Sequence, residues 1–508
     1  MTLPELAVFD ELLTYVRETS LLQTSADLLE WDERTGMPVQ GGEYRARQVT
    51  LLRGMVHERR TSATLGQWLA QLQDAFAADE STSPRRSAIA RMREDFERDC
   101  RLPRTLVESL ATATVRGQQA WERARHEDDF SLFRAELTEI LRLKREAALC
   151  LAKEGESLYD ALLGEYEPGA RVAELAPVFA SLRQHLVELI GRIGVVPKHQ
   201  APKIECLRRE YPVETQRSFS RLVAEAVGFD FRRGRLDETT HPFCTSLGPD
   251  DCRILTRYQS HWFPSGLFGT LHEAGHGIYE QGLPRAWYGC PPGTYASLGI
   301  HESQSRLWEN LVGRSLGFWK YFFPLLEQSF PQSLGNVGCE QFHAAVNAVQ
   351  PTLIRVEADE ATYNLHILVR LEIEQELLSG ELLVEDLPAA WNARYREVLG
   401  IEPSSDAAGV LQDVHWSAGL IGYFPTYTLG NIYAAQLFQA AERELGALEE
   451  MFSEGEFAPL LQWLRTHIHR HGRSYDAAEL IARACGERPN SEPLVASLNA
   501  RYGRIYSL

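Results

Sequence analysis

The chain has 508 residues, of which 44% are hydrophobic and 24% are charged, an ordinary composition for a globular protein. It carries 52 Lys and Arg against 70 Asp and Glu, which gives a formal net charge of −18. Such an acidic surface argues against nucleic acid or an anionic membrane as the main partner. The eight cysteines form no Cys-x-x-Cys pair, which argues against a thiolate metal site.

The sequence shows no signal for export or membrane insertion. Its first residues lack the basic region followed by an apolar one that a signal peptide has. No run of about 18 apolar residues occurs, so no transmembrane helix is expected. The scattered cysteines are typical of reduced thiols. We therefore expect a soluble cytoplasmic protein.

Residues 1–190 are predicted to form a succession of amphipathic helices. Leu, Ala and aromatic residues recur there at spacings of three and four, with Arg and Glu between them. The breaks fall at Pro and Gly, as in Glu167-Pro168-Gly169. The predicted helices are Glu5–Thr19, Glu43–Arg60, Pro84–Cys100, Pro103–Glu127 and Ser131–Glu154.

The remainder, residues 191–508, contains all the motifs described below. Helical periodicity breaks between Ile193 and Arg257, and Cys252–Tyr258 is predicted to be a short strand. Because no low-complexity linker occurs, we expect one domain over residues 1–508 and a mainly α fold, one large helical unit with a small β element. The later predicted helices are Ser265–Gln281, His301–Leu316, Glu340–Val349, Thr352–Ser379, Pro388–Val398, Leu429–Leu445, Pro459–Arg470 and Ala477–Ala484.

A possible metal site lies in the helix predicted after that strand, in His272-Glu273-Ala274-Gly275-His276. Two histidines four apart on a helix lie about 40° apart and one turn up, so both imidazoles can reach one metal ion. Glu273 projects beside them, near a metal-bound water. The spacing is typical of zinc hydrolases in which the glutamate is the general base. The alternative is two core histidines that happen to be four apart.

The ends and glycines of this helix carry their own predictions. Ser265 is expected to cap the N-terminus, and Gly282 followed by Pro284 to end the helix. Gly275 and Gly277 each weaken a helix by about 1 kcal/mol relative to Ala. We therefore expect another backbone to pass close to these glycines.

Two histidines and a water leave a tetrahedral zinc one protein ligand short. The candidates for this ligand are glutamates. Glu280 shares the first helix and would run alongside His276. Glu302 opens the next predicted helix and is the preferred ligand. Glu309 lies two turns further along the same face, where it could instead accept a hydrogen bond behind a ligand or be a surface charge.

Ordered motifs run through the second half of the chain. They are His241-Pro242-Phe243, Asp251-Cys252-Arg253-Ile254-Leu255-Thr256, His272-Glu273-Ala274-Gly275-His276, His301-Glu302-Ser303-Gln304-Ser305, Ile354-Arg355-Val356-Glu357-Ala358-Asp359 and Gly409-Val410-Leu411-Gln412-Asp413-Val414-His415-Trp416, followed by Gly422-Tyr423-Phe424-Pro425-Thr426-Tyr427. In these motifs and their order the chain resembles the carboxypeptidase Taq family of thermostable-type zinc metallocarboxypeptidases. The N-terminal half resembles it only in helical character and length. Leu255 stands where the family motif has Thr.

The resemblance implies a helical fold around a deep active-site groove, a small strand pair near the metal, and a homodimer. It also implies an exopeptidase that removes C-terminal residues from peptides with broad preference, sparing proline. By motif, His272, His276 and Glu302 would bind Zn²⁺, which Co²⁺ can replace. Glu273 would take a proton from the attacking water and return it to the leaving amine.

Further residues are needed to hold the substrate. A carboxypeptidase must clamp a terminal carboxylate, which suits the planar fork of arginine. Arg355 is our first choice and Arg253 our second, although Arg355 could instead form a salt bridge with Asp359, four residues on. His241 is a candidate for lining the substrate site. Candidates for stabilising the oxyanion are His415, Tyr423 and Tyr427, and each of the two tyrosines could equally be a packing residue.

Other histidines near these motifs are less informative. His301, beside Glu302, is expected either to support the site or to have no role. The His467-x-His469-x-His471 cluster looks like a metal site, but residues two apart diverge on a helix. We therefore predict that this cluster lies on the surface.

Two other functions fit parts of the pattern. A zinc oligopeptidase of the helical, closed-cleft type would also use His-Glu-x-x-His with a downstream glutamate. A scaffold protein with a structural metal would need four protein ligands, often cysteines, and no such set is visible.

Overall fold

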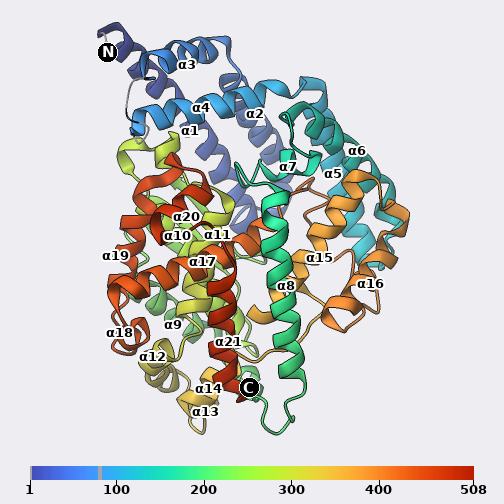
Figure 1. Ribbon diagram of the computed structural model, residues 1–508, viewed down its shortest axis with the longest axis vertical. Coiled ribbons are helices and arrows are strands. Elements are labelled where there is room, and N and C mark those ends of the chain that lie inside the picture. The colour runs from blue at the N-terminus through green and yellow to red at the C-terminus, as the bar shows by residue number, and fades with distance from the viewer. Residues whose placement is uncertain (1–2, 78–79, 81–82) are drawn as a thin grey trace. The chain divides into compact units, whose positions relative to one another are not determined.

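The computed structural model describes residues 3–77, 80 and 83–508 (Figure 1). The chain folds into two compact units, and each is made of three chain segments. The predicted mainly α fold with a small β element is confirmed. The single domain and the deep groove stay predictions. No described helix combines the length and apolar character needed to cross a membrane.

The first unit comprises Met1–Cys100, Lys203–Val346 and Leu437–Arg488. Its helix α1 runs on to Thr35, far beyond the predicted end at Thr19, because no Pro or Gly interrupts it. The helices that begin in this unit are α1 (Leu3–Thr35), α2 (Gly42–Arg60), α3 (Ala63–Ala75), α4 (Pro84–Arg101), α9 (Val213–Ala226), α10 (Phe263–Gly282), α11 (Leu298–Arg306), α12 (Leu316–Ser329), α13 (Pro331–Leu334), α14 (Cys339–Val346), α18 (Leu448–Ser453), α19 (Ala458–His467) and α20 (Ala477–Cys485).

The second unit comprises Arg101–Pro202, Asn347–Gln436 and Pro489–Leu508. The helices that begin there are α5 (Arg104–Glu127), α6 (Ser131–Leu151), α7 (Leu158–Leu163), α8 (Val172–Gly194), α15 (Glu360–Ser379), α16 (Leu387–Leu399), α17 (Pro425–Leu445) and α21 (Glu492–Tyr506).

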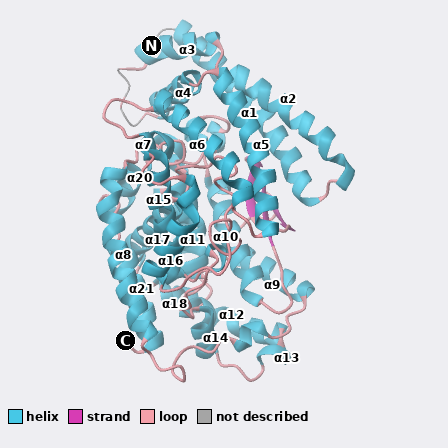
Figure 2. Cartoon of the chain, turned by 90° about the vertical axis from the view of Figure 1, so that its right-hand side faces the viewer, coloured by secondary structure: helices cyan, strands magenta, loops and turns pink. Residues whose placement is uncertain are grey.

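One small sheet lies in the first unit (magenta in Figure 2). Its order is β1 (Gly234–Glu238), β3 (Asp251–Thr256), β2 (Phe243–Gly248), so the implied strand pair is in fact three strands. β3 is parallel to β1 and antiparallel to β2. The predicted strand starts one residue earlier than expected and ends at Thr256. The last three residues of β3 are buried, so both faces of the strand are covered there. A strand covered on both faces does not need alternating apolar and polar residues, which made its bounds hard to predict.

Helix α10 packs on this sheet and carries the His-Glu-x-x-His motif. Its apolar residues at helical spacing are buried: Leu267, Leu271, Ala274 and Ile278. The helix ends at Gly282 as predicted. Ser265 is not the cap, because the helix already begins at Phe263, and the Ser265 hydroxyl instead donates to the Arg257 carbonyl at 3.2 Å.

Gly275 lets α10 approach α11 closely. A Cβ atom at this position would lie 2.5 Å from the Gln304 carbonyl oxygen and 2.6 Å from the Ser305 Cα. The predicted close backbone is therefore present at Gly275. At Gly277 the nearest atom is instead a carbon of the Phe229 ring, at 2.5 Å, so this glycine accommodates a side chain.

Two predicted helices are divided in the structure. The one expected at Thr352–Ser379 begins at Glu360, where the Asp359 side chain accepts hydrogen bonds from the first turn of α15. The one expected at His301–Leu316 consists of α11 followed by a π-helical turn, η5 (Leu307–Val312). A side-chain cap and a wider turn both leave hydrophobic periodicity nearly unchanged, so the pattern alone did not reveal these breaks.

Gly275→Ala should destabilise the protein by about 1–3 kcal/mol, because the added methyl group overpacks the contact with α11. Urea unfolding followed by circular dichroism measures the effect. Gly54→Ala in α2 is the matched control, since a Cβ there meets no atom within 4 Å. It should stabilise by up to about 1 kcal/mol through helix propensity. Equal midpoints for the two variants would contradict the proposed packing role.

Candidate functional site

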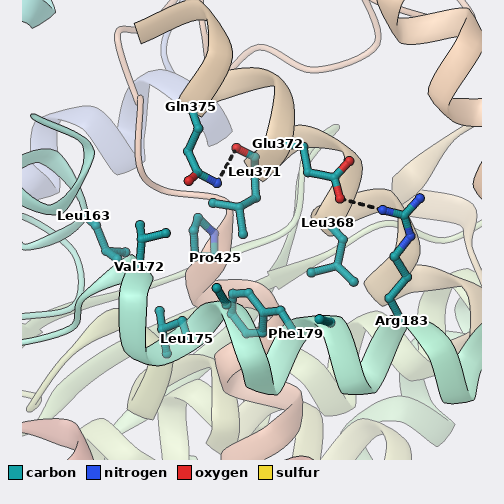
Figure 3. Close-up of a pocket in the computed structure, with 12 residues that line it drawn as sticks. Leu163, Val172, Leu175, Phe179, Arg183, Leu368, Leu371, Glu372, Gln375 and Pro425 are labelled. Atoms are coloured by element: carbon teal, nitrogen blue, oxygen red, sulfur yellow. Dashed lines mark hydrogen bonds and ion pairs between the residues drawn. The ribbon is translucent and has the colours of Figure 1, made fainter. Parts of the chain in front are cut away.

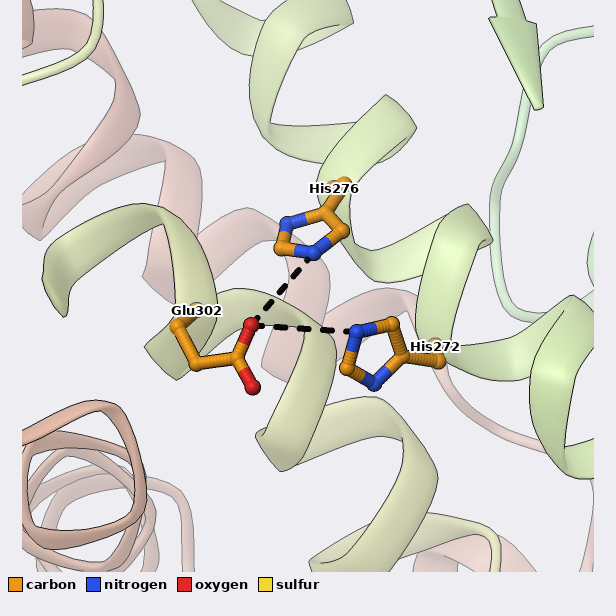
Figure 4. Close-up of side chains that lie close together, drawn as sticks. All are labelled: His272, His276 and Glu302. Carbon is orange, nitrogen blue, oxygen red and sulfur yellow. Dashed lines mark ion pairs between the residues drawn. The ribbon is translucent and has the colours of Figure 1, made fainter. Parts of the chain in front are cut away.

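Three side chains from two helices of the first unit converge on one point (Figure 4). Oε2 of Glu302 in α11 lies 3.7 Å from Nε2 of His272 and 3.6 Å from Nε2 of His276 in α10. Ligand atoms of a tetrahedral zinc at 2.0–2.1 Å would be separated by about 3.3 Å. Among the described residues, no other three His, Cys, Asp or Glu side chains are grouped in this way. The two imidazoles and one carboxylate therefore fit a divalent cation.

The other two glutamates considered as ligands lie behind the histidines. Oε2 of Glu309 is 2.9 Å from Nδ1 of His272. Oε1 of Glu280 is 3.0 Å from Nε2 of His301, whose backbone oxygen lies 3.0 Å from Nδ1 of His276. Nδ1 of each histidine thus has a partner while Nε2 faces Glu302, which is the usual arrangement around metal-ligating histidines.

Burial and neighbouring charges shift the pKa values in this cluster. Burial lowers the pKa of His272, but Glu302 and Glu309 outweigh it, and the pKa is raised. Burial and His301 hold the pKa of His276 well below its usual value. Burial raises the pKa of Glu309, but Arg306, His272 and Arg314 outweigh it and bring the value to about 2.

Glu273 is buried beside the candidate metal centre and is 5% exposed. Its Oε2 has no hydrogen-bond partner among the described residues. Burial raises the pKa of Glu273 to about 7, with His272 opposing the shift. A buried carboxyl oxygen without a partner is costly for stability, which makes a functional role the simpler explanation.

Arg355 lies in a buried cluster of the second unit. Its Nε donates to Oδ1 of Asp413 at 2.9 Å and its Nη1 donates to the Tyr363 hydroxyl at 3.0 Å. Arg370, which is fully buried in α15, donates from Nε to Oδ2 of Asp413 at 2.6 Å. Arg355 is thus paired with Asp413 and not with Asp359. The two arginines outweigh the effect of burial and lower the pKa of Asp413.

Sequence reasoning did not identify Arg370 or Tyr363 as part of this cluster. A signal for Arg370 was present, because it follows Ile367-Leu368-Val369 and precedes Leu371 in an apolar run. An arginine in such a run must find a buried partner. Tyr363 offered no comparable signal, since a tyrosine in an amphipathic helix usually only packs.

The candidate oxyanion residues lie together in the second unit. Nε2 of His415 is 3.2 Å from the Tyr427 hydroxyl, and the Tyr423 ring centroid is 5.3 Å from those of both His415 and Tyr427. Burial lowers the pKa of His415 to about 3, so its imidazole is neutral near pH 7. A neutral imidazole and two phenols can all donate hydrogen bonds.

Arg253 and His241 belong to the first unit. Arg253 in β3 donates to both carboxylate oxygens of Asp251 at 2.9 Å, and its guanidinium lies 4.2 Å from the Trp31 ring centroid. His241 is exposed in the connection between β1 and β2. Arg253 and Arg355 therefore belong to different clusters and to different units.

The surface prediction for the later histidine cluster is wrong for His469. This side chain is 0% exposed, and its Nε2 lies 3.0 Å from Oε1 of Gln304 in α11. Helix α19 ends at His467, and in the 3-10 segment that follows His469 is buried, while His467 and His471 are partly exposed. The three rings do diverge as expected: His467 stacks on Trp463, with ring centroids 4.4 Å apart.

An apolar cavity of about 180 Å³ lies in the second unit between α8 and α15 (Figure 3). Phe179, Leu368 and Leu371 line it, and the Arg183–Glu372 ion pair lies at one side. None of the predicted site residues lines this cavity. Pro425 also lines the cavity, and it directly follows Tyr423 and Phe424 in the chain.

Comparisons with known proteins cover nearly the whole chain. The family model described as carboxypeptidase Taq (M32) metallopeptidase matches residues 11–502. Thermostable carboxypeptidase 1 of Thermus thermophilus is 48% identical over 98% of this chain and 99% of its own length. Carboxypeptidase 1 of Bacillus subtilis is 36% identical over 98% of each chain. The crystal structure of the M32 carboxypeptidase from Deinococcus radiodurans R1 matches with a TM-score of 0.94 and 40% identity, covering 99% of this chain and 100% of that one.

Asp413→Asn should destabilise the protein by about 3–5 kcal/mol at pH 7, because it leaves two buried guanidinium groups without a carboxylate. Because the folded-state pKa of Asp413 is lowered, its stabilisation is present above the unfolded value of 3.8 and is lost as the pH falls through the folded value. The difference in urea midpoint between the wild type and Asp413→Asn should therefore be the same at about pH 7 and at about pH 5.

Glu108→Gln is the control for that measurement, because Glu108 forms an exposed ion pair with Arg104 at 2.7 Å. Its effect should stay within about 0.5 kcal/mol. An Asp413→Asn variant as stable as this control would show that Asp413 does not hold the two arginines.

Proposed function

The chain belongs to the carboxypeptidase Taq (M32) family of metallopeptidases, and we propose that it is a zinc enzyme that releases residues from the free C-terminal end of peptides. Its predicted family and its predicted class, a peptide-hydrolysing metallocarboxypeptidase, are confirmed by the matches along the chain. The zinc, the role of each residue and the breadth of specificity are the proposal. The observation that carries it is the convergence of His272, His276 and Glu302 beside Glu273, whose Oε2 has no hydrogen-bond partner among the described residues.

His272, His276 and Glu302 would hold the metal, and Co²⁺ could replace Zn²⁺ because nitrogen and oxygen ligands accept both. A divalent cation at this position polarises the scissile carbonyl and lowers the pKa of water. Glu273 accepts the proton of the attacking water and passes it to the leaving amine. Its Oε2 supports this role, because it has no hydrogen-bond partner among the described residues and is therefore open to a water molecule.

Arg355 would bind the terminal carboxylate of the substrate. Among the described residues, Asp413 is the one carboxylate that contacts both Arg355 and Arg370. Two buried guanidinium groups facing one carboxylate leave an excess positive charge. His366 and His415 do not change this balance, since burial lowers the pKa of both imidazoles well below neutrality. Such a cluster attracts a further anion.

His415, Tyr423 and Tyr427 would stabilise the tetrahedral oxyanion. Their side chains supply up to three neutral hydrogen-bond donors. His241 and Arg253 would also contact the substrate.

We also propose that the enzyme is a cytoplasmic homodimer with broad preference and low activity toward proline. The dimer, the location and the preference rest on the resemblance in motifs and on the scattered cysteines, which form no disulfide among the described residues. Size-exclusion chromatography with light scattering would measure the mass of the assembly.

Glu273→Gln should lower kcat by about 10²–10⁴-fold, because the amide cannot accept the proton of the attacking water. The zinc content should be unchanged, since Glu273 is not a proposed ligand. Metal analysis and peptide hydrolysis are measured on the same preparation. Full activity with zinc bound would show that the base is wrongly assigned, and hydrolysis by a metal-free wild type would overturn the metal centre.

Arg355→Lys should lower kcat/KM for peptides with a free C-terminus by about 10- to 100-fold, because lysine keeps the charge but lacks the bidentate fork. Activity on the C-terminally amidated peptide should be low in both the wild type and the variant. The ratio of kcat/KM for the free acid to kcat/KM for the amide should therefore fall in Arg355→Lys. Arg253→Lys is the control and should keep the preference. Loss of the preference in Arg253→Lys alone would mean that Arg253, and not Arg355, binds the terminal carboxylate.

The same substrate pair distinguishes the oligopeptidase alternative. An endopeptidase would cleave both peptides at internal bonds with similar rates. Mass spectrometry of the products identifies the bond that is cleaved.

A further inference from the structure

The two carboxylate oxygens of Glu302 face different partners. Oε2 faces the two histidines and also accepts a hydrogen bond from the Ser305 hydroxyl at 3.3 Å. Oε1 accepts a hydrogen bond from Nε of Arg306 at 2.7 Å. Figure 4 shows the same division, with one oxygen directed at both rings and the other turned away. The candidate metal ligand thus offers only one oxygen to an ion.

Arg306 is held firmly enough to enforce this division. It follows Glu302 by four residues on α11, and the two side chains are only 13% and 8% exposed. An exposed pair of this kind would exchange freely with water and contribute little. A buried one is ordered, because leaving either charge without its partner is costly.

The same guanidinium also reaches the carboxylate behind His272. Nη1 of Arg306 lies 3.4 Å from Oε2 of Glu309, the oxygen that contacts His272. Arg314 approaches the other oxygen of Glu309 at 3.6 Å. Arg306 therefore links the glutamate that binds the ion with the glutamate that orients a histidine ligand.

A π-helical turn brings this second glutamate into place. Glu309 lies within η5, where the Gly313 amide bonds to the Trp308 carbonyl five residues earlier. Such turns are rare and frequently occur at functional sites, because the extra residue re-aims the side chains around it. Here the turn begins directly after Arg306.

In this cluster two arginines oppose two glutamates. Glu302 and Glu309 contribute two negative charges, and Arg306 and Arg314 contribute two positive ones. Without Arg306, the cluster would have an excess negative charge and Oε1 of Glu302 would be free to bind an ion together with Oε2. Two-oxygen binding by a carboxylate raises the coordination number, which suits larger and more flexible ions.

We propose that Arg306 is a positioning residue that limits Glu302 to one-oxygen coordination and so keeps a position open for water on a four-coordinate ion. This inference rests on the proposed metal centre at His272, His276 and Glu302. It predicts that Arg306 determines which metal the site prefers. With Arg306 present, the site favours ions that accept four ligands, such as Zn²⁺ and Co²⁺, over Mn²⁺.

The test compares Co²⁺-loaded wild type with Arg306→Met. Four-coordinate Co²⁺ absorbs visible light several-fold more strongly than five- or six-coordinate Co²⁺. The variant should lose most of this absorption and should lower the ratio of Zn²⁺ to Mn²⁺ affinity by about 10- to 100-fold. A merely structural role for Arg306 would change the stability and leave the spectrum of bound Co²⁺ unaltered.

Arg314→Met is the matched control. It removes one positive charge from the same cluster, but Arg314 contacts Glu309, Asn310 and the Val346 carbonyl. Its Co²⁺ spectrum should remain that of the wild type. Equal loss of absorption in both variants would mean that net charge, and not the occupation of Oε1, controls the coordination, and this would overturn the proposal.

A second measurement does not depend on the folding of any variant. A crystal structure of the zinc-loaded wild type should place one oxygen of Glu302 on the ion, with Oε1 still on Arg306. Two-oxygen binding by Glu302 would overturn this inference and leave the metal centre intact. Zinc bound at other residues, or no zinc binding, would overturn the proposed function itself.

Discussion

The close backbone contact between α10 and α11 sets the geometry on which the candidate metal centre depends. His272 and His276 come from one helix and Glu302 from the other, so the separation of the helices fixes the separation of the ligand atoms. Gly275 allows that separation because any side chain there would meet the backbone of α11. A glycine destabilises a helix by about 1 kcal/mol relative to alanine. Overpacking the contact with an added methyl group would destabilise the protein by about 1–3 kcal/mol.

Each unit holds one buried carboxylate between two arginines. Glu309 lies between Arg306 and Arg314 in the first unit, and Asp413 lies between Arg355 and Arg370 in the second. In both cases the arginines keep the carboxylate ionised despite its burial. An ionised carboxylate is a strong acceptor, so it can fix the orientation of a functional group: His272 in the first case and Arg355 in the second.

The sequence predicted the helix with the histidines, the convergence of Glu302 and the close approach at Gly275, because each follows from spacing within one or two helices. It did not predict the burial of His469 or the partners of Arg355. These depend on contacts between segments far apart in the chain, such as His469 with Gln304 and Arg355 with Asp413. The π-helical turn was also missed, since one extra residue barely changes the apolar pattern.

Burial alone does not distinguish a catalytic carboxyl group from a structural one. Burial raises the pKa of both Glu273 and Glu374 to about 7. Glu374 nevertheless accepts hydrogen bonds from the Tyr159 hydroxyl at 2.7 Å, the Trp416 indole at 3.0 Å and the Gly422 amide at 3.1 Å. These donors occupy both of its oxygens and tie three segments of the second unit together. Among the described residues, Glu273 keeps Oε2 without a hydrogen-bond partner, which leaves that oxygen open to a reacting water as the proposed general base requires.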